Sequence, residues 1–134
     1  MKNARFVFTL LFCGVLFTSI TGAKASLSVS DKASLQAAMQ RYISRSLVNG
    51  TYLSMNRKTG DIRALHPVTA HPAILQLGKY FVLCFDFRDD RGKSVNIDFY
   101  IARREQSYVV FHSEVDNRVL LQRLMKAGKA KRAD

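Results

Sequence analysis

The chain has 134 residues and a formal net charge of +11, from 21 Lys and Arg against 10 Asp and Glu. This length predicts one domain that can bury its own core, and two cysteines are too few for a disulfide-rich scaffold. A strong excess of positive charge favours anionic partners, such as polyanions, lipid headgroups or acidic proteins.

The first 25 residues have the pattern of a secretory signal peptide. Lys2 and Arg5 precede an uncharged run over 6–20, and Ala23 and Ala25 form a small-x-small cleavage site. The run is shorter than the roughly 20 residues that a membrane-spanning helix needs, which disfavours a retained anchor. We predict cleavage near Ala25 and a periplasmic or secreted domain of net charge +8, because the removed segment carries three cations and no acid.

Cysteine usage predicts a domain that is stabilised by packing alone. Cys13 lies within the predicted signal peptide, so Cys84 is the single cysteine of the exported domain. One cysteine cannot close an internal disulfide, and an unpaired cysteine usually packs as a small apolar residue. We therefore expect Cys84 to be buried.

After the signal, apolar residues at helical spacing predict an amphipathic helix over 32–48. Ser30 or Asp31 is the expected N-terminal cap, and Asn49-Gly50 ends the helix. The apolar residues of its expected buried face are Leu35, Met39, Tyr42, Ile43 and Leu47.

A hairpin and a loop are predicted next. Short alternating runs at 51–55 and 61–65 flank a polar turn that ends in glycine, which is typical of a hairpin. Two His-Pro steps within 66–72 indicate a loop, because proline cannot continue a helix or a central strand. Residues 73–77 are expected to form a short turn.

Three strand signals and a helix signal complete the domain. The strands are predicted over 80–87, 94–103 and 107–115, and a short helix over 117–126. The whole order predicts an α+β fold: a long N-terminal helix packed on an antiparallel sheet of about five strands, with a short C-terminal helix. A single α+β domain would then occupy 26–127.

The C-terminal residues 128–134 are expected to form a basic flexible tail beyond the domain.

The two strongest strand signals also predict how their strands pair. If Asp89 lies opposite Lys93, all large apolar residues of both strands fall on one face, and a slip by one residue would put them in water. The resulting pairs are Phe87 with Val95, Phe85 with Ile97, Leu83 with Phe99, and Phe81 with Ile101. By the same rule the last hairpin pairs Ile101 with Val109 and Phe99 with Phe111. We expect this apolar face to pack against the long helix.

The opposite, mixed face of the sheet holds the candidate site. In this register Cys84, Asp98 and His112 form a row across three strands about 4.8 Å apart. Asp98 and His112 are a candidate acid/base pair, and Tyr100 would orient a substrate. Cys84 lies two strands from His112, too far for a nucleophile and its base. The candidate ligand-binding residues are Tyr80, Cys84, Asp86, Asn96, Asp98, Tyr100, His112 and Glu114.

Neither a metal nor another cofactor is predicted. His66, His71, His112 and Cys84 do not have the spacing of a usual zinc site. The sequence contains no phosphate-binding glycine loop, dinucleotide fingerprint or serine nucleophile elbow. Nucleic acid is not an expected partner, because the cations form no recognisable binding module and export argues against it.

Parts of the chain resemble known proteins at the level of topology. The residues that carry this are Tyr52-Leu53, Asn56, Thr59-Gly60-Asp61-Ile62 and the stretch from Tyr80 to Tyr100. Together with the element order, they resemble small exported bacterial proteins of cystatin-like or nuclear-transport-factor-like topology. The resemblance implies a protease inhibitor, a ligand-binding module or an acid/base enzyme. The cystatin motif Gln-x-Val-x-Gly is not present, so protease inhibition is not carried over.

Three functions follow from these observations. The first is a non-enzymatic envelope module that binds an unknown, anionic small ligand or an envelope protein. The second is a small acid/base enzyme that uses Asp98 and His112. The third is an envelope protein held at an anionic membrane surface by its basic tail. The mixed face is equally compatible with a homodimer interface.

Overall fold

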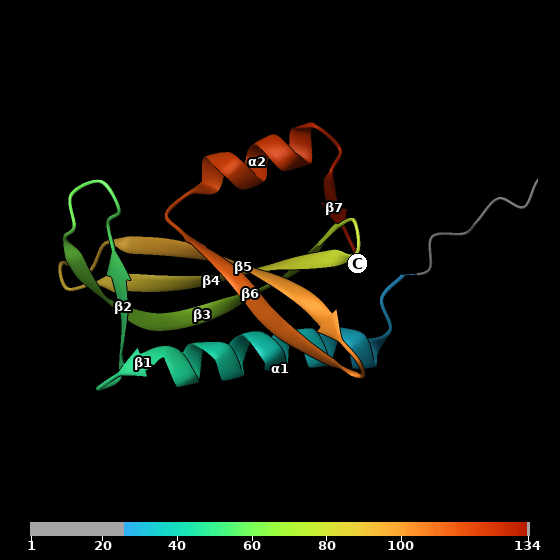
Figure 1. Cartoon of the computed structure of the whole chain (residues 1–134), viewed down its shortest axis with the longest axis horizontal. Coiled ribbons are helices and arrows are strands. Elements are labelled where there is room, and N and C mark those ends of the chain that lie inside the picture. Colours follow the sequence, from blue (N-terminus) through green and yellow to red (C-terminus); the bar gives the residue numbers. More distant parts are fainter. Residues whose placement is uncertain (1–25, 134) are drawn as a thin grey trace, which may run out of the picture.

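The computed structural model describes residues 26–133, so the predicted signal peptide at 1–25 lies outside the described residues. A single antiparallel sheet lies between two helices, with α1 on one face and α2 over the other (Figure 1). The α+β class is confirmed, but the sheet has seven strands rather than about five. The elements are α1 (Val29–Ser46), β1 (Leu47–Val48), β2 (Thr51–Met55), β3 (Ile62–Leu77), β4 (Tyr80–Asp89), β5 (Ser94–Arg104), β6 (Ser107–Val115), α2 (Arg118–Lys126) and β7 (Ala130–Arg132).

The long helix α1 begins earlier than predicted. Ser28 is its cap, because the Ser28 side chain accepts a hydrogen bond of 3.0 Å from the backbone N–H of Asp31. The expected caps Ser30 and Asp31 therefore lie inside the helix. It ends at Ser46, since the next two residues pair as β1. Its buried residues, Leu35, Ala38, Met39 and Ile43, have the i, i+3, i+4, i+8 spacing of one helix face.

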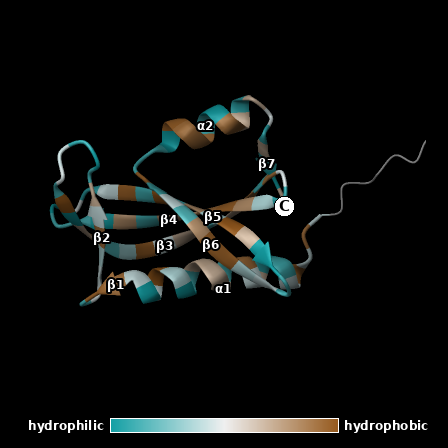
Figure 2. Cartoon of the chain, viewed as in Figure 1, coloured by the Kyte–Doolittle hydropathy of each residue, from teal (hydrophilic) through white to brown (hydrophobic). Residues whose placement is uncertain are grey.

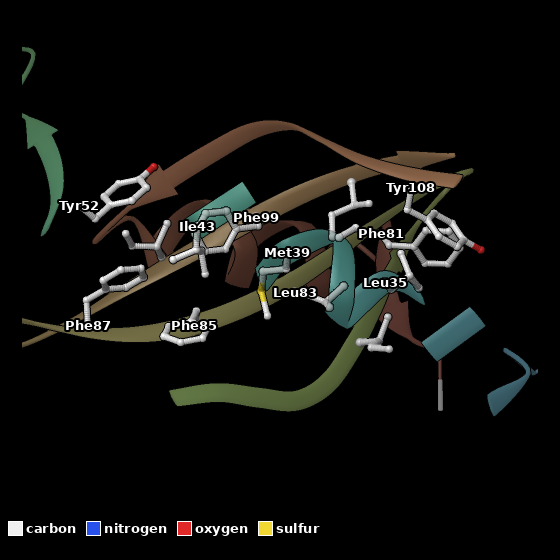
Figure 3. Packing of buried hydrophobic residues seen from close by; sticks show 14 of the residues in the cluster. Leu35, Met39, Ile43, Tyr52, Phe81, Leu83, Phe85, Phe87, Phe99 and Tyr108 are labelled. Carbon is white, nitrogen blue, oxygen red and sulfur yellow. The ribbon is translucent and has the colours of Figure 1, made fainter. Parts of the chain in front are cut away.

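The predicted pairing of β4 with β5 is confirmed at every position. Phe87 pairs with Val95, and Phe81 pairs with Ile101 at the other end. Asp89 closes the turn, because its backbone N–H donates to the carbonyl of Lys93 and its carboxylate accepts from two backbone N–H groups of the turn. Figure 3 shows the apolar side chains of these strands packed against α1.

The predicted pairing of β5 with β6 is wrong. The turn has two residues, Glu105 and Gln106, instead of three, so Ile101 pairs with Val110 rather than Val109. A bulge at Phe111 then shifts the register again. The core pair of Phe99 with Phe111 therefore does not form: Phe99 pairs with Ser113.

The His-Pro segment forms a strand, which contradicts the predicted loop at 66–72 and the predicted turn at 73–77. β3 runs through both prolines and pairs with β4 across two register shifts. On its other side β3 pairs with β2 only over 62–65 and with β7 only over 75–77. The prolines thus lie where β3 pairs with β4 alone. Proline lacks a backbone N–H, and its absence is tolerated at sheet edges and at bulges.

The predicted flexible tail is also ordered in its described part. β7 pairs with β3, with Ala130 opposite Leu77 and Arg132 opposite Leu75. Ala130 is buried, which fixes the strand against the sheet. Only Asp134 lies outside the described residues of this segment.

The sheet curls around α1. Strands β2 and β6 are four steps apart in the sheet order, which would separate them by about 19 Å in a flat sheet. Instead the Tyr52 hydroxyl lies 3.3 Å from the Ser113 hydroxyl, and Arg63 lies 3.7 Å from Asp116. We call the face around α1 the inner face and the face under α2 the outer face.

Candidate functional site

The structure places the predicted site residues on the outer face. Asp86 and Cys84 come from β4, Asn96 and Asp98 from β5, and His112 from β6. Tyr80, Tyr100 and Glu114 share this face, since they occupy the same alternation of their strands. His112 reaches the outer face because of the bulge at Phe111. The shorter turn alone would point the His112 side chain to the inner face, and the extra residue Phe111 returns it to the outer face.

The predicted row across three strands differs in one member. Cys84 pairs with Asp98 as expected, but Asp98 pairs on its other side with Glu114 rather than His112. His112 lies opposite Tyr100, and their ring centroids are 5.5 Å apart. The carboxylate that hydrogen-bonds to His112 is that of Glu114, at 2.7 Å from Nε2.

Asp98 is a buried carboxylate that connects the sheet to α2. It is 1 % exposed, its Oδ1 accepts a hydrogen bond of 2.8 Å from the Cys84 thiol, and Arg118 Nη1 lies 3.3 Å away. Burial raises the pKa of Asp98, although the Cys84 hydrogen bond and the Arg118 charge oppose this. Asp98 therefore attaches Arg118, the first residue of α2, to the sheet.

The Cys84 thiol is buried, as predicted. Burial, and then the hydrogen bond to the Asp98 carboxylate, raise the pKa of Cys84 to about 12. A thiol with this pKa is almost entirely protonated at neutral pH, and a protonated thiol is a poor nucleophile. The geometry thus disfavours thiol catalysis.

A second carboxylate cluster on the outer face joins the predicted residues Asp86 and Asn96 to His71, which the sequence analysis did not include in the site. His71 Nε2 lies 2.7 Å from Asp86 Oδ2, and the Asn96 amide donates to Asp86 Oδ1 at 3.0 Å. Burial acts to raise the pKa of Asp86, but the hydrogen bonds from Asn96 and His71 together lower it. The sequence contains no signal for the contact of His71 with Asp86, because the two prolines around His71 predict a loop rather than a strand beside β4.

Glu114 accepts hydrogen bonds from both sides. Its Oε1 is bonded to His112, and its Oε2 accepts from the Asn117 amide at 3.1 Å. These bonds lower the pKa of Glu114, with the His112 bond as the largest cause. The carboxylates of Asp86, Asp98 and Glu114 are thus all matched to partners within the protein.

The part of the outer face around Tyr100 is covered by α2. Leu121 of α2 is buried against Val82, Cys84 and Tyr100, and Ala130 of β7 joins the same cluster. Tyr100 is buried and its hydroxyl has no hydrogen-bond partner in the described part of the chain. Burial, with the nearby Asp98 carboxylate next in importance, raises the pKa of Tyr100 to about 12.

The largest group of unmatched charges lies over the outer face. Residues 118–132, which we call the cationic segment, comprise α2, β7 and the turn between them. This segment contains six Lys and Arg and no Asp or Glu. Arg118 is paired with Asp98, whereas within residues 26–133 no ion pair forms at four exposed cations: Arg123, Lys126, Lys129 and Lys131.

Comparison with known proteins gives no family for the chain. No family model, no curated protein and no solved structure matches it. Within the described residues, no cluster of three or more His, Cys, Asp or Glu side chains is arranged to hold a metal ion. Neither helix of that part combines the length and apolar character needed to cross a membrane.

Proposed function

We propose that the protein is an exported, non-enzymatic binding module of the cell envelope, and that its partner is anionic. The signal-peptide pattern over residues 1–25 supports export. The cationic segment, rather than the polar outer face below it, supports the anionic partner.

The observation that carries this proposal is a difference between the acids of the outer face, which have basic partners, and the exposed cations of the cationic segment. Six carboxylates lie within 4 Å of a basic side chain: three form ion pairs with Arg, and three lie at hydrogen-bond distance from a His ring nitrogen. The acids of the outer face therefore have partners within the protein, while four exposed cations of the cationic segment, Arg123, Lys126, Lys129 and Lys131, form no ion pair within residues 26–133. Such a concentration of one sign attracts the opposite charge and increases the rate of encounter.

The proposal is tested by salt-dependent binding to a soluble polyanion. We compare residues 26–134 with a variant in which Arg123, Lys126, Lys129 and Lys131 are all changed to Gln. The matched control changes four exposed cations elsewhere to Gln, namely Arg41, Arg45, Arg91 and Lys93. On a heparin column the first variant is expected to elute at clearly lower salt than the control, because surface attraction is screened by salt. Equal elution of the two variants would contradict the proposal.

A small acid/base enzyme is the second candidate. Two observations favour it: the raised pKa of Asp98, and the buried hydroxyl of Tyr100, which has no hydrogen-bond partner among residues 26–133. The geometry supplies His112 with Glu114 as its carboxylate instead of Asp98. Under this alternative, loss of the carboxylate in an Asp98→Asn variant abolishes a measurable activity. Under the binding proposal, the same variant retains its heparin elution position.

A further inference from the structure

We infer that the anionic partner is the surface of a lipid bilayer, and that α2 lies along that surface with its solvent-facing side in contact with the headgroups. The inference rests on the proposed function and names the class of its partner.

The way in which α2 is held determines which side it presents. Leu121 is buried in the sheet, Arg118 lies 3.3 Å from the buried Asp98, and β7 pairs with β3 directly after the helix. The helix is therefore fixed at both ends. Its leucine side is used by the protein, and only the opposite side is available to a partner.

That opposite side mixes cations with apolar groups. Arg123 and Lys126 are exposed, and Val119, which is 62 % accessible, lies on the same side of the helix. Met125 is 44 % accessible and lies at the edge of that side, because it follows the buried Leu121 by one helical turn. Figure 2 shows hydrophobic and hydrophilic residues interleaved along α2. A soluble polyanion offers no apolar phase to exposed apolar side chains. A bilayer binds cations at its headgroups and apolar side chains just below them.

A second observation on the outer face points to the same partner. The bulge in β6 leaves Phe111 54 % exposed, with its ring 5.3 Å from that of Tyr80. Lys79 lies over the Tyr80 ring, 5.4 Å from its centroid. Tyr80 is in the turn region next to β7, because Leu77 pairs with both Tyr80 and Ala130. Phe111 is thus an exposed ring beside a half-buried tyrosine and a lysine, and aromatic rings beside cations are favoured where apolar and aqueous phases meet.

The test is flotation of residues 26–134 with lipid vesicles. This segment is used because both hydrophobic clusters of the described residues lie within it, and because the apolar run at 6–20 would itself bind lipid. The vesicles contain either phosphatidylcholine alone or phosphatidylcholine with 30 % phosphatidylglycerol. Binding is expected only to the anionic vesicles, and it should weaken with added salt.

Two variants separate a bilayer from other polyanions. The four-Gln variant of the cationic segment should bind anionic vesicles at least about a hundredfold more weakly, since each basic residue near an anionic surface contributes about fivefold. The control with four Gln elsewhere should retain most of its binding. A Val119→Gln, Met125→Gln variant should lose about tenfold toward vesicles and nothing toward heparin, because only the bilayer offers an apolar phase.

Each outcome decides one claim. The bilayer is rejected as the partner if the protein binds heparin but not vesicles, or if the Val119→Gln, Met125→Gln variant keeps its vesicle affinity. Either result leaves the proposed function unaffected. Equal vesicle binding by the two four-Gln variants overturns the assignment to α2 and β7. Failure to bind either heparin or vesicles overturns both proposals. Circular dichroism of every variant shows whether it is folded, and both variants of the cationic segment change only exposed side chains.

Discussion

The inner and outer faces of the sheet are built from different kinds of residue. On the inner face the buried residues of β4 and β5 are apolar at every alternate position, and α1 covers them. The outer face buries Asp98 beside Cys84 and is covered only in part, by α2 and β7. The comparison indicates that the inner face supplies most of the stability, whereas the outer face attaches the cationic segment and leaves it exposed.

The largest expected difference in unfolding free energy is between two phenylalanines, which the sequence analysis predicts to pair in one core. Phe99 is fully buried on the inner face, and Phe111 is largely exposed on the outer face. Phe99→Ala should lower the free energy of unfolding by about 3–5 kcal/mol, because it leaves a cavity. Phe111→Ala should change it by about 0.5 kcal/mol. Urea denaturation of both variants checks this, and similar losses would contradict the exposed position that the bulge in β6 gives Phe111.

Removing the buried carboxylate should have the next largest effect. Asp98→Ala takes away the partner of the Cys84 thiol and of Arg118, which is itself partly exposed. We expect a loss of about 1–3 kcal/mol in unfolding free energy. If Asp98 attaches α2, hydrogen exchange should also speed up in residues 118–126 more than in α1. Faster exchange confined to α1 would contradict this role.

The pH dependence of stability sharpens the assignment of Asp98. Its pKa is raised in the folded protein above the ordinary value of 3.8, so the folded state binds its proton more tightly than the unfolded chain. Its contribution to stability is therefore complete below pH 3.8 and declines as the pH rises through the folded-state pKa. Asp86 and Glu114 have lowered pKa values and act in the opposite direction, losing their contribution as the pH falls.

Asp98→Asn keeps the shape of the side chain and cannot titrate. The unfolding free energy of the native protein minus that of this variant should therefore decrease between pH 3.8 and neutral pH. Urea denaturation of both proteins at several pH values measures this difference. A difference that grows with pH would show that Arg118 outweighs burial at Asp98.

The smallest expected effect concerns the thiol. Cys84 is buried and its pKa is raised to about 12, so a thiol reagent should not label the native protein within minutes. Labelling should become complete in denaturing urea. Rapid native labelling would mean that α2 opens readily from the outer face.

The two hairpins around β5 show how far the sequence can predict this fold. Between β4 and β5 the large apolar residues of both strands leave one favourable register, and that register is observed. Between β5 and β6 the turn is one residue shorter, and Phe111 is extra. The residues on both sides of Phe111 are compatible with either face of the sheet, so the pattern of side chains alone could not locate the bulge.

The candidate site was predictable in composition and in the pairing of Cys84 with Asp98, but not in its other contacts. Asp98 and His112 do share the outer face, because two successive shifts of one residue cancel in the direction of the side chain. Their partners Arg118 and Glu114 depend on the register and on where α2 packs. The His71 contact with Asp86 arises because β3 continues through two prolines, a path that local preferences disfavour.

A nuclear magnetic resonance titration tests the central claim most directly. Residues 26–134, labelled with ¹⁵N, are titrated with a heparin oligosaccharide, and amide shifts are followed residue by residue. Binding by the cationic segment predicts that the largest shifts fall within 118–132. Largest shifts at His71, Asp86 and His112, with 118–132 unchanged, would contradict it and return the binding site to the polar residues of the outer face.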